Sequence, residues 1–432
     1  MNRKVTIAPL VTFRILFGML MLASMIRFWA NGWIEELYIE PTFYFPFIEG
    51  VRPFPGIGMY VVFAVMMLAT VLIIIGLFYR YAISAFFILF TYVELIDKTN
   101  YLNHYYFISL ISFLMIFIPA HKAFSLDARI KGSETSEVPV LYLNILRLQM
   151  GILYFFAGIA KINSEWLLKA QPLKMWLSAN VFQPIIGPLF RYKITAYIFS
   201  WFGMIYDITI PFFLSFRKTV YTAYLFVIGF HFITWWMFPI GMFPWIMMVI
   251  TTVFFPAGFH ERLLGGLKTL VGWNRVSGTR VDHITPIYKV LITVFFFFQL
   301  LLPMRYLLYP GNLFWTEQGY RFSWRVMLME KAGSATFYVR DKGADQSILV
   351  SNYEFLTPQQ EKMMATQPDM IVQFAHYLEE VYKLKGMSDP VVTADVLVTL
   401  NGQPARTFID PHIDLTKVEN NWKNKDWILE YE

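Results

Sequence analysis

The chain has 432 residues, of which 57% are hydrophobic, 19% aromatic and only 15% charged, and its mean hydropathy is +0.48. Soluble proteins carry about 25% charged residues, so this composition excludes an ordinary soluble protein and predicts an integral membrane protein. Cysteine is absent, which excludes disulfides, thiolate metal sites, iron–sulfur clusters and a cysteine nucleophile. The net charge of +6 does not indicate nucleic-acid binding, because the basic residues are distributed as in membrane loops.

The apolar windows predict a mainly α-helical, polytopic membrane bundle. A helix that crosses about 30 Å of hydrocarbon needs about 20 apolar residues. The third, fourth and eighth windows are short, so about nine spans is the best count. The windows are 8–28, 56–78, 82–97, 104–120, 139–160, 195–215, 219–238, 241–257 and 286–304.

The charge distribution divides the chain after residue 304. Residues 1–304 carry 23 basic and 13 acidic side chains, whereas residues 305–432 carry 13 and 17. We therefore expect a transmembrane bundle at 1–304 and a water-exposed domain at 305–432. With the N-terminus in the cytoplasm, 12 basic residues fall inside and 7 outside, as the positive-inside rule favours. An odd number of spans then places the C-terminal domain outside the cytoplasm.

The C-terminal domain is predicted to be α+β with a β-sheet. Strands are expected at Val326–Leu328 and Ala335–Val339, separated by a turn at Lys331–Gly333. A further strand, Val391–Leu400, ends in the hairpin signal Asn401-Gly402. Residues 358–385 have the length and composition of one or two helices.

Polar residues of the fifth window recur at intervals of three and four, which places them on one helical face. An arginine, a phenol, two glycines and a terminal amine on one face should point into the bundle, where the glycines leave room for a neighbouring helix or a ligand. The alternative for the terminal lysine is that it only snorkels to the interface. The residues of this stripe are Asn144, Arg147, Gly151, Tyr154, Gly158 and Lys161.

Other polar groups have a structural and a functional interpretation. Asp97 and Lys98, between the third and fourth windows, could belong to a solvated loop. His231 in the seventh window could be satisfied by a neighbouring helix. Asp207 in the sixth window would be costly in lipid unless neutralised, and Arg147 lies at a similar depth, so we expect a structural ion pair between them.

The expected topology brings three of these groups to the outer leaflet. Lys161 closes an outward-going helix, His104 opens an inward-going helix, and His231 lies in the outer half of another. A shared cavity open to the external face is the simplest interpretation. Three tryptophans would either wall this cavity with flat apolar surface, which suits a lipid-soluble ligand, or form an interfacial belt: Trp235, Trp236 and Trp245.

At these positions the chain resembles the vitamin K-dependent γ-glutamyl carboxylase family, in a compact form with an HTTM-like membrane domain. The matching blocks occur in the family's order across most of the chain and include loop, helix-end and tail segments. The blocks are Asp97–Tyr106 (DKTNYLNHYY), Tyr154–Trp166 (YFFAGIAKINSEW), Phe230-His231 with Ile240–Phe243 (IGMF), and Thr316–Tyr320 (TEQGY) with Phe322–Met327 (FSWRVM).

The resemblance implies a peptidyl-glutamate carboxylase in which reduced vitamin K is oxygenated to the 2,3-epoxide while a glutamyl γ-carbon gains CO2. Lys161 would be the base that deprotonates the quinol, and His104 would act with it. Asn103 and His104 would hydrogen-bond the quinol oxygens, and His231 and Tyr154 would lie in the same pocket. The resemblance further implies O2 and CO2 as co-substrates. A metal is not expected, because the sequence shows no His/Asp ligand cluster.

The chemistry supports a membrane-embedded cavity for this reaction. A buried neutral amine can deprotonate a phenol-like quinol, but no side chain can remove the γ-hydrogen of a glutamate. A stronger base must arise from quinol oxygenation, and it must be kept from water. Such a cavity admits the quinol from the bilayer and excludes water. The expected partners are therefore the lipid bilayer and a glutamate-containing peptide or protein, and no nucleic acid.

The sequence departs from the animal members of the family. It is shorter, has no cysteine for their disulfide, and has Ala160 where they have a basic residue before the catalytic lysine. The compact form suggests a multi-pass protein of a bacterial inner membrane, with phylloquinol or menaquinol as the cofactor. Three alternatives remain: quinol epoxidation without productive carboxylation, a non-enzymatic membrane sensor or chaperone with a peptide-binding tail, and a transporter. Broken or repeated helices would be expected for a transporter and are not evident.

Overall fold

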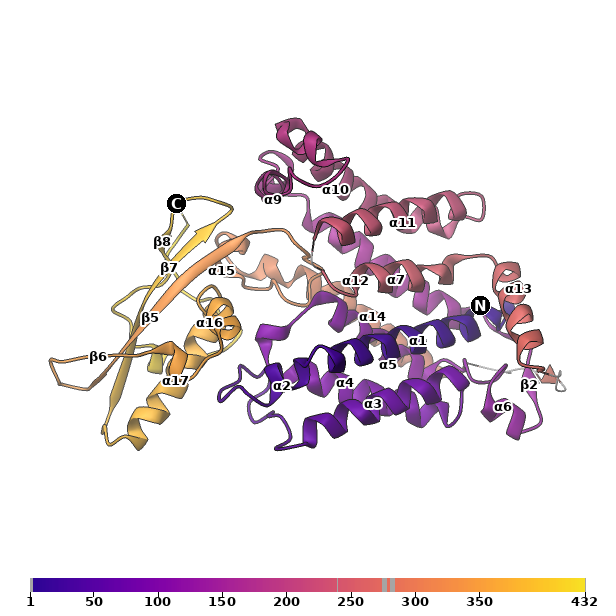
Figure 1. Ribbon diagram of the computed structural model, residues 1–432, viewed down its shortest axis with the longest axis horizontal. Coiled ribbons are helices and arrows are strands. Elements are labelled where there is room, and N and C mark those ends of the chain that lie inside the picture. Colours follow the sequence, from indigo (N-terminus) through magenta and orange to yellow (C-terminus); the bar gives the residue numbers. More distant parts are fainter. Residues whose placement is uncertain (1–2, 239, 274–277, 280–283, 432) are drawn as a thin grey trace.

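The protein, seen here as a computed structural model, is described for residues 3–238, 240–273, 278–279 and 284–431. Long apolar helices form a bundle in its N-terminal part, and a smaller α+β domain lies at one end of this bundle (Figure 1). The bundle helices are α1 (Ala8–Ala30), α3 (Gly58–Ile75), α4 (Tyr79–Ile96), α5 (Asn103–Phe117), α7 (Leu141–Ala160), α10 (Lys193–Ser215), α11 (Val220–Met237) and α14 (Pro286–Leu301).

The bundle confirms a multi-pass membrane protein. Within the described residues, seven helices are long and apolar enough to cross a membrane, or up to eight if one bent pair forms a single span. That pair consists of Phe243–Phe254, which contains α12 (Phe243–Ile250) and η3 (Thr251–Phe254), and α13 (Ala257–Leu270), with a bend of 110° between them. The fourth predicted window forms α5, which has only 15 residues. The count is thus close to the nine expected. The fourth window, whose helix is short, and the eighth, which belongs to the bent pair, account for the difference.

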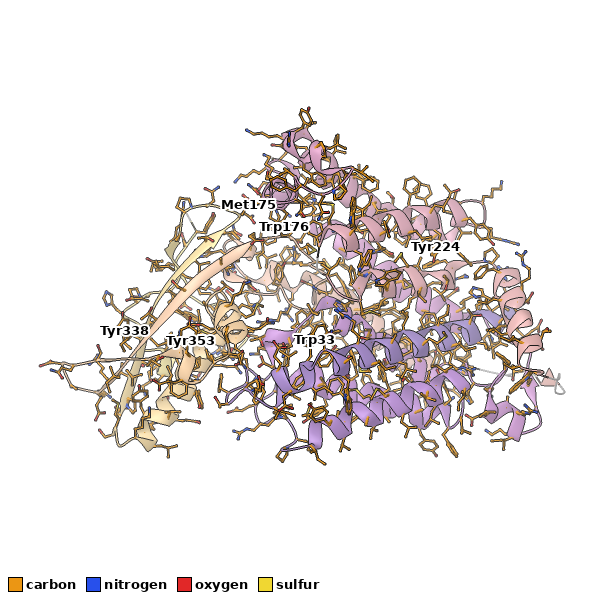
Figure 2. The ribbon with its side chains drawn as sticks, viewed as in Figure 1. Trp33, Met175, Trp176, Tyr224, Tyr338 and Tyr353 are labelled. Carbon is orange, nitrogen blue, oxygen red and sulfur yellow. The ribbon has the colours of Figure 1, made fainter. Side chains whose placement is uncertain are left out.

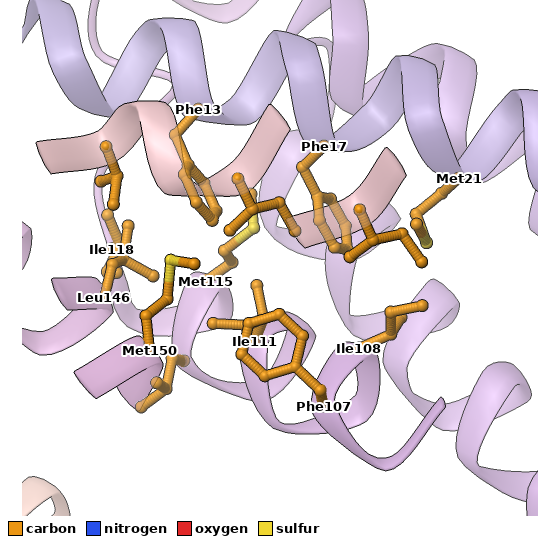
Figure 3. Packing of buried hydrophobic residues seen from close by; sticks show 14 of the residues in the cluster. Phe13, Phe17, Met21, Phe107, Ile108, Ile111, Met115, Ile118, Leu146 and Met150 are labelled. Carbon is orange, nitrogen blue, oxygen red and sulfur yellow. The ribbon is translucent and has the colours of Figure 1, made fainter. Parts of the chain in front are cut away.

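The bundle core consists of apolar side chains from helices distant in sequence. Phe13, Phe17 and Met21 of α1 face residues of α5, including Ile111, and of α7, including Met150 (Figure 3). Large apolar side chains elsewhere on the helices remain exposed, for example 68% for Leu225. An exposed apolar exterior around a packed interior is the arrangement that lipid requires.

The C-terminal domain contains a four-stranded antiparallel sheet in the order β6-β5-β7-β8. In β7 alternate residues are buried, which indicates that one face is covered. Helix α17 packs against this strand, and its buried residues recur every three or four positions. The elements are β5 (Lys331–Asp341), β6 (Ile348–Leu349), α16 (Pro358–Met364), α17 (Pro368–Leu384), β7 (Pro390–Leu400) and β8 (Arg406–Thr407).

The predicted strand at 391–400, the Asn401-Gly402 hairpin and the helical region at 358–385 agree with this domain. The turn expected at Lys331–Gly333 is wrong, because β5 runs through it without interruption, and Val326–Leu328 forms no strand. The reason is close packing at Gly333. A Cβ there would lie 2.8 Å from the carbonyl oxygen of Leu397 and 3.0 Å from that of Ala365, so this glycine permits backbone approach within a strand.

Shorter elements close both ends of the bundle. The N-terminus lies at the end remote from the C-terminal domain (Figure 1). There β1 (Lys4–Thr6) pairs with β3 (Glu137–Pro139), and β2 (Glu134–Thr135) pairs with β4 (Gly278–Thr279). The remaining short helices are α2 (Trp33–Tyr38), η1 (Lys98–Asn100), α6 (Leu126–Ile130), α8 (Ser164–Leu167), α9 (Leu173–Ala179), η2 (Gly187–Arg191), η4 (Leu302–Leu308), α15 (Leu313–Thr316), η5 (Asn352–Glu354) and η6 (Leu415–Lys417).

Candidate active site

A cavity of ≈ 980 Å³, partly open to the outside, lies between α7, α10, α11 and the segment that follows α15. Its walls are mainly aromatic and aliphatic, with a few polar side chains among them. This is the composition of a pocket for a flat, largely apolar ligand held by a few hydrogen bonds. The polar and charged residues of the lining are Asn103, Tyr154, Lys161, Asp207, His231 and Thr234.

The amine of Lys161 is buried in this cavity and paired with a carboxylate. Lys161 Nζ lies 2.6 Å from Asp207 Oδ2 and donates a second hydrogen bond to the carbonyl oxygen of Ala157 at 3.2 Å. It also lies 5.6 Å from the ring centre of Trp166. Of the three positions around the nitrogen, two are used, so one remains for a ligand. Burial of Lys161 in the interior replaces the snorkelling alternative.

The expected ion pair between Arg147 and Asp207 is wrong. The Arg147 guanidinium donates instead to the carbonyl oxygens of Val253 and Phe254, at 3.1 and 3.5 Å. These carbonyls belong to η3, where the chain stops being helical just before Pro256, so they lack the usual helical partners. Asp207 lies beside Gly158, eleven residues or about 16 Å further along α7 than Arg147, and therefore pairs with Lys161 instead.

A second polar pair lies in the same cavity. The hydroxyl of Tyr154 and Nε2 of His231 are 3.2 Å apart, and both residues are buried. Nδ1 of His231 has no hydrogen-bond partner among the described residues. Because Tyr154 and Lys161 are seven residues apart, they share one face of α7. The predicted stripe therefore brings a phenol and an amine to the cavity, and α11 adds the imidazole of His231.

The glycines of the stripe allow α7 and α10 to lie close together. A Cβ at Gly158 would come within 2.7 Å of the backbone nitrogen of Ile208, next to Asp207. At Gly151 the nearest atom would be Pro211 Cβ at an ordinary 3.8 Å. Gly158 is therefore required for the close approach that brings Asp207 to Lys161, as small residues do in membrane helix pairs.

Asn103 and His104 differ in their relation to the cavity. Asn103 lines it, but its amide already donates to the carbonyl oxygen of Arg325 at 3.0 Å and accepts from Tyr101 at 3.1 Å. One amide N–H is left for a ligand. His104 is not in the lining. Its ring lies 5.8 Å from that of Phe243, which in turn lies 5.7 Å from His231.

The segment after α15 supplies a wall that the sequence did not predict. Trp324, Val326 and Met327 line the cavity, and the indole nitrogen of Trp324 has no partner among the described residues. Phe322, Trp324 and Met327 adopt φ of 62°, 60° and 51°. Three non-glycine residues in this region of φ are costly and persist only where packing enforces them. The strain coincides with the place where this segment closes the cavity.

The tryptophans of the cavity are not those expected. Trp235 and Trp245 form a pair with ring centres 5.5 Å apart, remain about 40% exposed and do not line the cavity. Trp166 and Trp176 line it in their place. Trp176 of α9 also donates its indole N–H to Glu330 beside the sheet. Figure 2 shows Trp176, with Met175, where α9 approaches the long strands of the C-terminal domain.

Asp97 and Lys98 are buried and join the bundle to the C-terminal domain. Asp97 Oδ2 accepts from Gln360 at 2.8 Å, and Lys98 Nζ lies 3.0 Å from Asp369 Oδ2. Arg321 also pairs with Asp369, at 2.7 Å. Burial alone would raise the pKa of Asp369, but the adjacent Arg321 and Lys98 charges hold it below the usual value. This loop is thus a domain junction rather than a solvated loop.

The chemistry of the cavity fits an aromatic diol with an apolar tail. The apolar walls would accept the ring, and the unpartnered nitrogens of His231 and Trp324, together with the free position at Lys161, would meet its oxygens. No group of three or more His, Cys, Asp or Glu side chains that could hold a metal occurs among the residues the structure describes.

The fold and cavity define a polytopic membrane protein with a partly open aromatic cavity and a C-terminal α+β domain. Residues 2–259 match the family model of the HTTM domain, and residues 284–432 match that of the vitamin K-dependent gamma-carboxylase lumenal domain. The first match covers more than half of the chain. The chain therefore belongs to the HTTM family, and the match of its C-terminal third to the carboxylase lumenal domain agrees with the motifs. No solved structure matches it.

Proposed function

We propose that this protein carboxylates glutamyl residues of a polypeptide at the γ-carbon, using CO2, and couples this to oxygenation of reduced vitamin K by O2 to the 2,3-epoxide. The observation that carries the proposal is the buried Lys161–Asp207 pair, at 2.6 Å, in an aromatic cavity beside the Tyr154–His231 pair. The two family matches support the carboxylase activity.

Lys161 serves as the base for the quinol hydroxyl. An ammonium cannot accept a proton, so the amine must first lose one, and Asp207 Oδ2, at 2.6 Å, is the nearest acceptor for it. The resulting neutral amine and carboxylic acid contain the same number of protons as the ion pair. They also avoid the free-energy cost of burying two charges away from water. The amine then takes the quinol proton, and Asp207 keeps the first one. Asp207 is in this scheme a proton-holding residue.

Other residues of the cavity orient and shield the ligand. The Tyr154–His231 pair and the remaining amide N–H of Asn103 bind the quinol oxygens, which fixes the ring relative to Lys161. His104 acts through Phe243 and reaches a ligand only if that ring turns aside. Reduced vitamin K supplies, on reaction with oxygen, the strong base that glutamate requires. The apolar walls keep water from it.

We further propose the orientation and domain boundary given by the charge pattern. The N-terminus would be cytoplasmic, and residues 305–432 would lie outside the cytoplasm of a bacterial cell. The N-terminus and the C-terminal domain lie at opposite ends of the bundle, which supports their placement on opposite sides of the membrane (Figure 1). The boundary at residue 304 falls within η4, which continues α14 from Leu302 to Leu308.

The test uses purified full-length protein with reduced vitamin K, labelled bicarbonate and a glutamate-rich peptide. We expect both epoxide and labelled peptide from the wild type and from Lys169→Ala, which alters an exposed lysine eight residues further on. Lys161→Met should form neither product. Epoxide without labelled peptide would indicate a quinol oxygenase. Quinol turnover by Lys161→Met at the wild-type rate would disprove the assignment of the base.

A further inference from the structure

A second, strongly basic pocket of ≈ 940 Å³ lies at the junction of the two domains. Four cationic side chains and only two carboxylates line it, with several neutral hydrogen-bonding groups. None of the six charged residues belongs to the lining of the aromatic cavity. The charged residues are Lys98, Arg305, Glu317, Arg321, Asp369 and Lys425.

Both carboxylates are already paired. Asp369 Oδ2 accepts from Lys98 at 3.0 Å and from Arg321 at 2.7 Å. Glu317 lies 3.0 Å from Lys331, which is outside the pocket lining. No salt bridge neutralises the two other cations, Arg305 and Lys425, within the part of the chain that the structure describes. The pocket therefore has an uncompensated positive charge.

Arg305 is held in place without a counter-ion. Its guanidinium donates to the carbonyl oxygen of Arg321 at 3.0 Å and lies 5.2 Å from the ring centre of Trp422. The backbone of Trp422 is anchored by Tyr309, whose hydroxyl donates to the Trp422 carbonyl oxygen at 2.9 Å, while the indole itself is largely exposed. A guanidinium fixed by a carbonyl and an aromatic face keeps other N–H groups for an anion.

Lys425 provides the sharpest observation. Its Nζ is buried, has no hydrogen-bond partner among the described residues, and lies 5.6 Å from the ring centre of Trp427. Its backbone is positioned by Gln318, which accepts from the Lys425 N–H at 3.4 Å. Burial lowers the pKa of Lys425, Asp369 raises it, and the Lys98 and Arg321 charges lower it further. A buried donor without an acceptor is unfavourable, and a bound anion would satisfy it.

The surroundings of the pocket favour a polypeptide over a lipid headgroup. The pocket shares Phe47, Lys98 and Asn420 with a larger open groove of ≈ 1740 Å³ between the loop after α2 and helix α17. The basic pocket is also lined by Arg321 and Phe322, and Phe322 is only two residues before Trp324 of the aromatic cavity wall. The groove, the basic pocket and the cavity wall thus follow one another over extramembrane segments. An extended chain with acidic side chains fits this succession.

We propose that the pocket formed by Lys98, Arg305, Arg321 and Lys425 binds a carboxylate of an acidic polypeptide segment adjacent to the glutamate that is modified. This inference rests on the proposed function in one respect, which is that the bound polypeptide is the substrate of carboxylation. The site itself is a carboxylate subsite outside the cavity. It would select substrates in which glutamates are clustered, because one acidic residue docks while another reaches the cavity.

The test measures binding, so it does not depend on quinol turnover. A fluorescein-labelled peptide with clustered glutamates is titrated with full-length protein in neutral-lipid nanodiscs, and fluorescence anisotropy gives the Kd. The same peptide with glutamine at every glutamate is the ligand control. Lys425→Met is compared with Lys425→Arg and with Lys423→Met, which alters an exposed lysine of the same loop. Thermal unfolding of each variant reports folding.

We expect Lys425→Met to weaken binding about tenfold, the effect of losing one charge-assisted hydrogen bond. Lys425→Arg and Lys423→Met should bind like the wild type. The glutamine peptide should bind the wild type at least tenfold more weakly, a result that requires no variant to fold. Equal binding of the two peptides, or of Lys425→Met and the wild type, would overturn the inference. The titration is repeated in nanodiscs that contain phosphatidylglycerol, and an effect of Lys425→Met seen only there would also overturn the inference, since it would indicate a lipid site.

If the wild type binds the acidic peptide through Lys425 but never labels it, the carboxylate subsite stands and the proposed carboxylation fails. If it labels the peptide and Lys425→Met binds it equally well, the carboxylation stands and the subsite fails.

Discussion

Replacing either member of the Lys161–Asp207 pair should destabilise the protein, and replacing both should restore much of the loss. The side chains are only 8% and 6% exposed, so a single substitution leaves one charge buried without its partner. Breaking such a pair costs about 3–5 kcal/mol. The single variants Lys161→Met and Asp207→Asn should therefore each unfold at a lower temperature than the wild type.

The double variant Lys161→Met/Asp207→Asn removes both charges while it keeps the side-chain volumes. Neutral replacement of both members of a buried pair is often tolerated. The double variant should therefore lose about 2–3 kcal/mol less stability than the sum of the two single losses. Activity should behave differently. Quinol epoxidation should be absent from Lys161→Met and from the double variant, because both lack the amine, whereas Asp207→Asn should keep a reduced rate.

Thermal unfolding in detergent and epoxide formation from reduced vitamin K would measure the two quantities on the same preparations. A stable double variant without activity separates the role of the base from a loss of folding. Additive effects of the two substitutions on stability would refute the buried pair. Recovery of epoxidation in the double variant would refute Lys161 as the base.

Further predictions concern three other contacts. Gly158→Ala should lower the thermal midpoint and abolish epoxidation, because its Cβ would meet the α10 backbone at 2.7 Å, whereas Gly151→Ala, with 3.8 Å available, should be tolerated. Tyr154→Phe removes the hydroxyl that meets His231 and should lower kcat/KM for the quinol about tenfold in steady-state assays. It should lower the thermal midpoint only slightly, because one buried nitrogen of His231 loses its partner. An unchanged kcat/KM would exclude the pair from quinol binding. Asp369→Asn should cost about 3 kcal/mol at pH 7. Because the folded pKa of Asp369 lies below the usual value, this stabilisation is complete above about pH 4 and is lost as the pH falls further, so thermal midpoints of variant and wild type should converge in acid; a constant difference would contradict the linkage.

Much of the bundle could be predicted because lipid imposes length and composition on each span. The windows that became α1, α3, α7, α10 and α11 agree with the helices to within two or three residues. The helix α12 is shorter than its window because the chain bends by 110° before α13. Pro256 marks this break in the sequence, but hydropathy averages over it.

The contents of the cavity were partly predictable for a similar reason. The spacing of Tyr154 and Lys161 defines a helical face, and the topology places His231 at the same end of the bundle. Spacing within one helix does not define the rotation of its neighbours, so the partner of Asp207 was assigned to Arg147 instead of Lys161. Depth along the membrane normal was the criterion used, and it was misjudged, because Arg147 and Lys161 are 14 residues or about 21 Å apart along the helix and Asp207 lies at the level of Lys161.

The wall after α15 could not be predicted from periodicity. Residues 322–327 have no regular secondary structure, and three of them adopt positive φ. The block Phe322–Met327 was visible as a family motif, but the apolar run at its end suggested a strand. Only the tertiary contacts, such as that of Asn103 with the Arg325 carbonyl, hold this segment against the bundle.

The same segment gives the cavity a dependence on the C-terminal domain. Trp324 closes the aromatic cavity, while Arg321, three residues earlier, pairs with Asp369 of α17. The bundle alone would leave the cavity without this wall, and water would reach the buried Lys161–Asp207 pair. Docking of the domain through Lys98 and Asp369 is therefore a condition for a dry site. A ligand that engages the basic pocket would act on the segment that separates it from the cavity, which connects polypeptide binding to the place where the quinol would react.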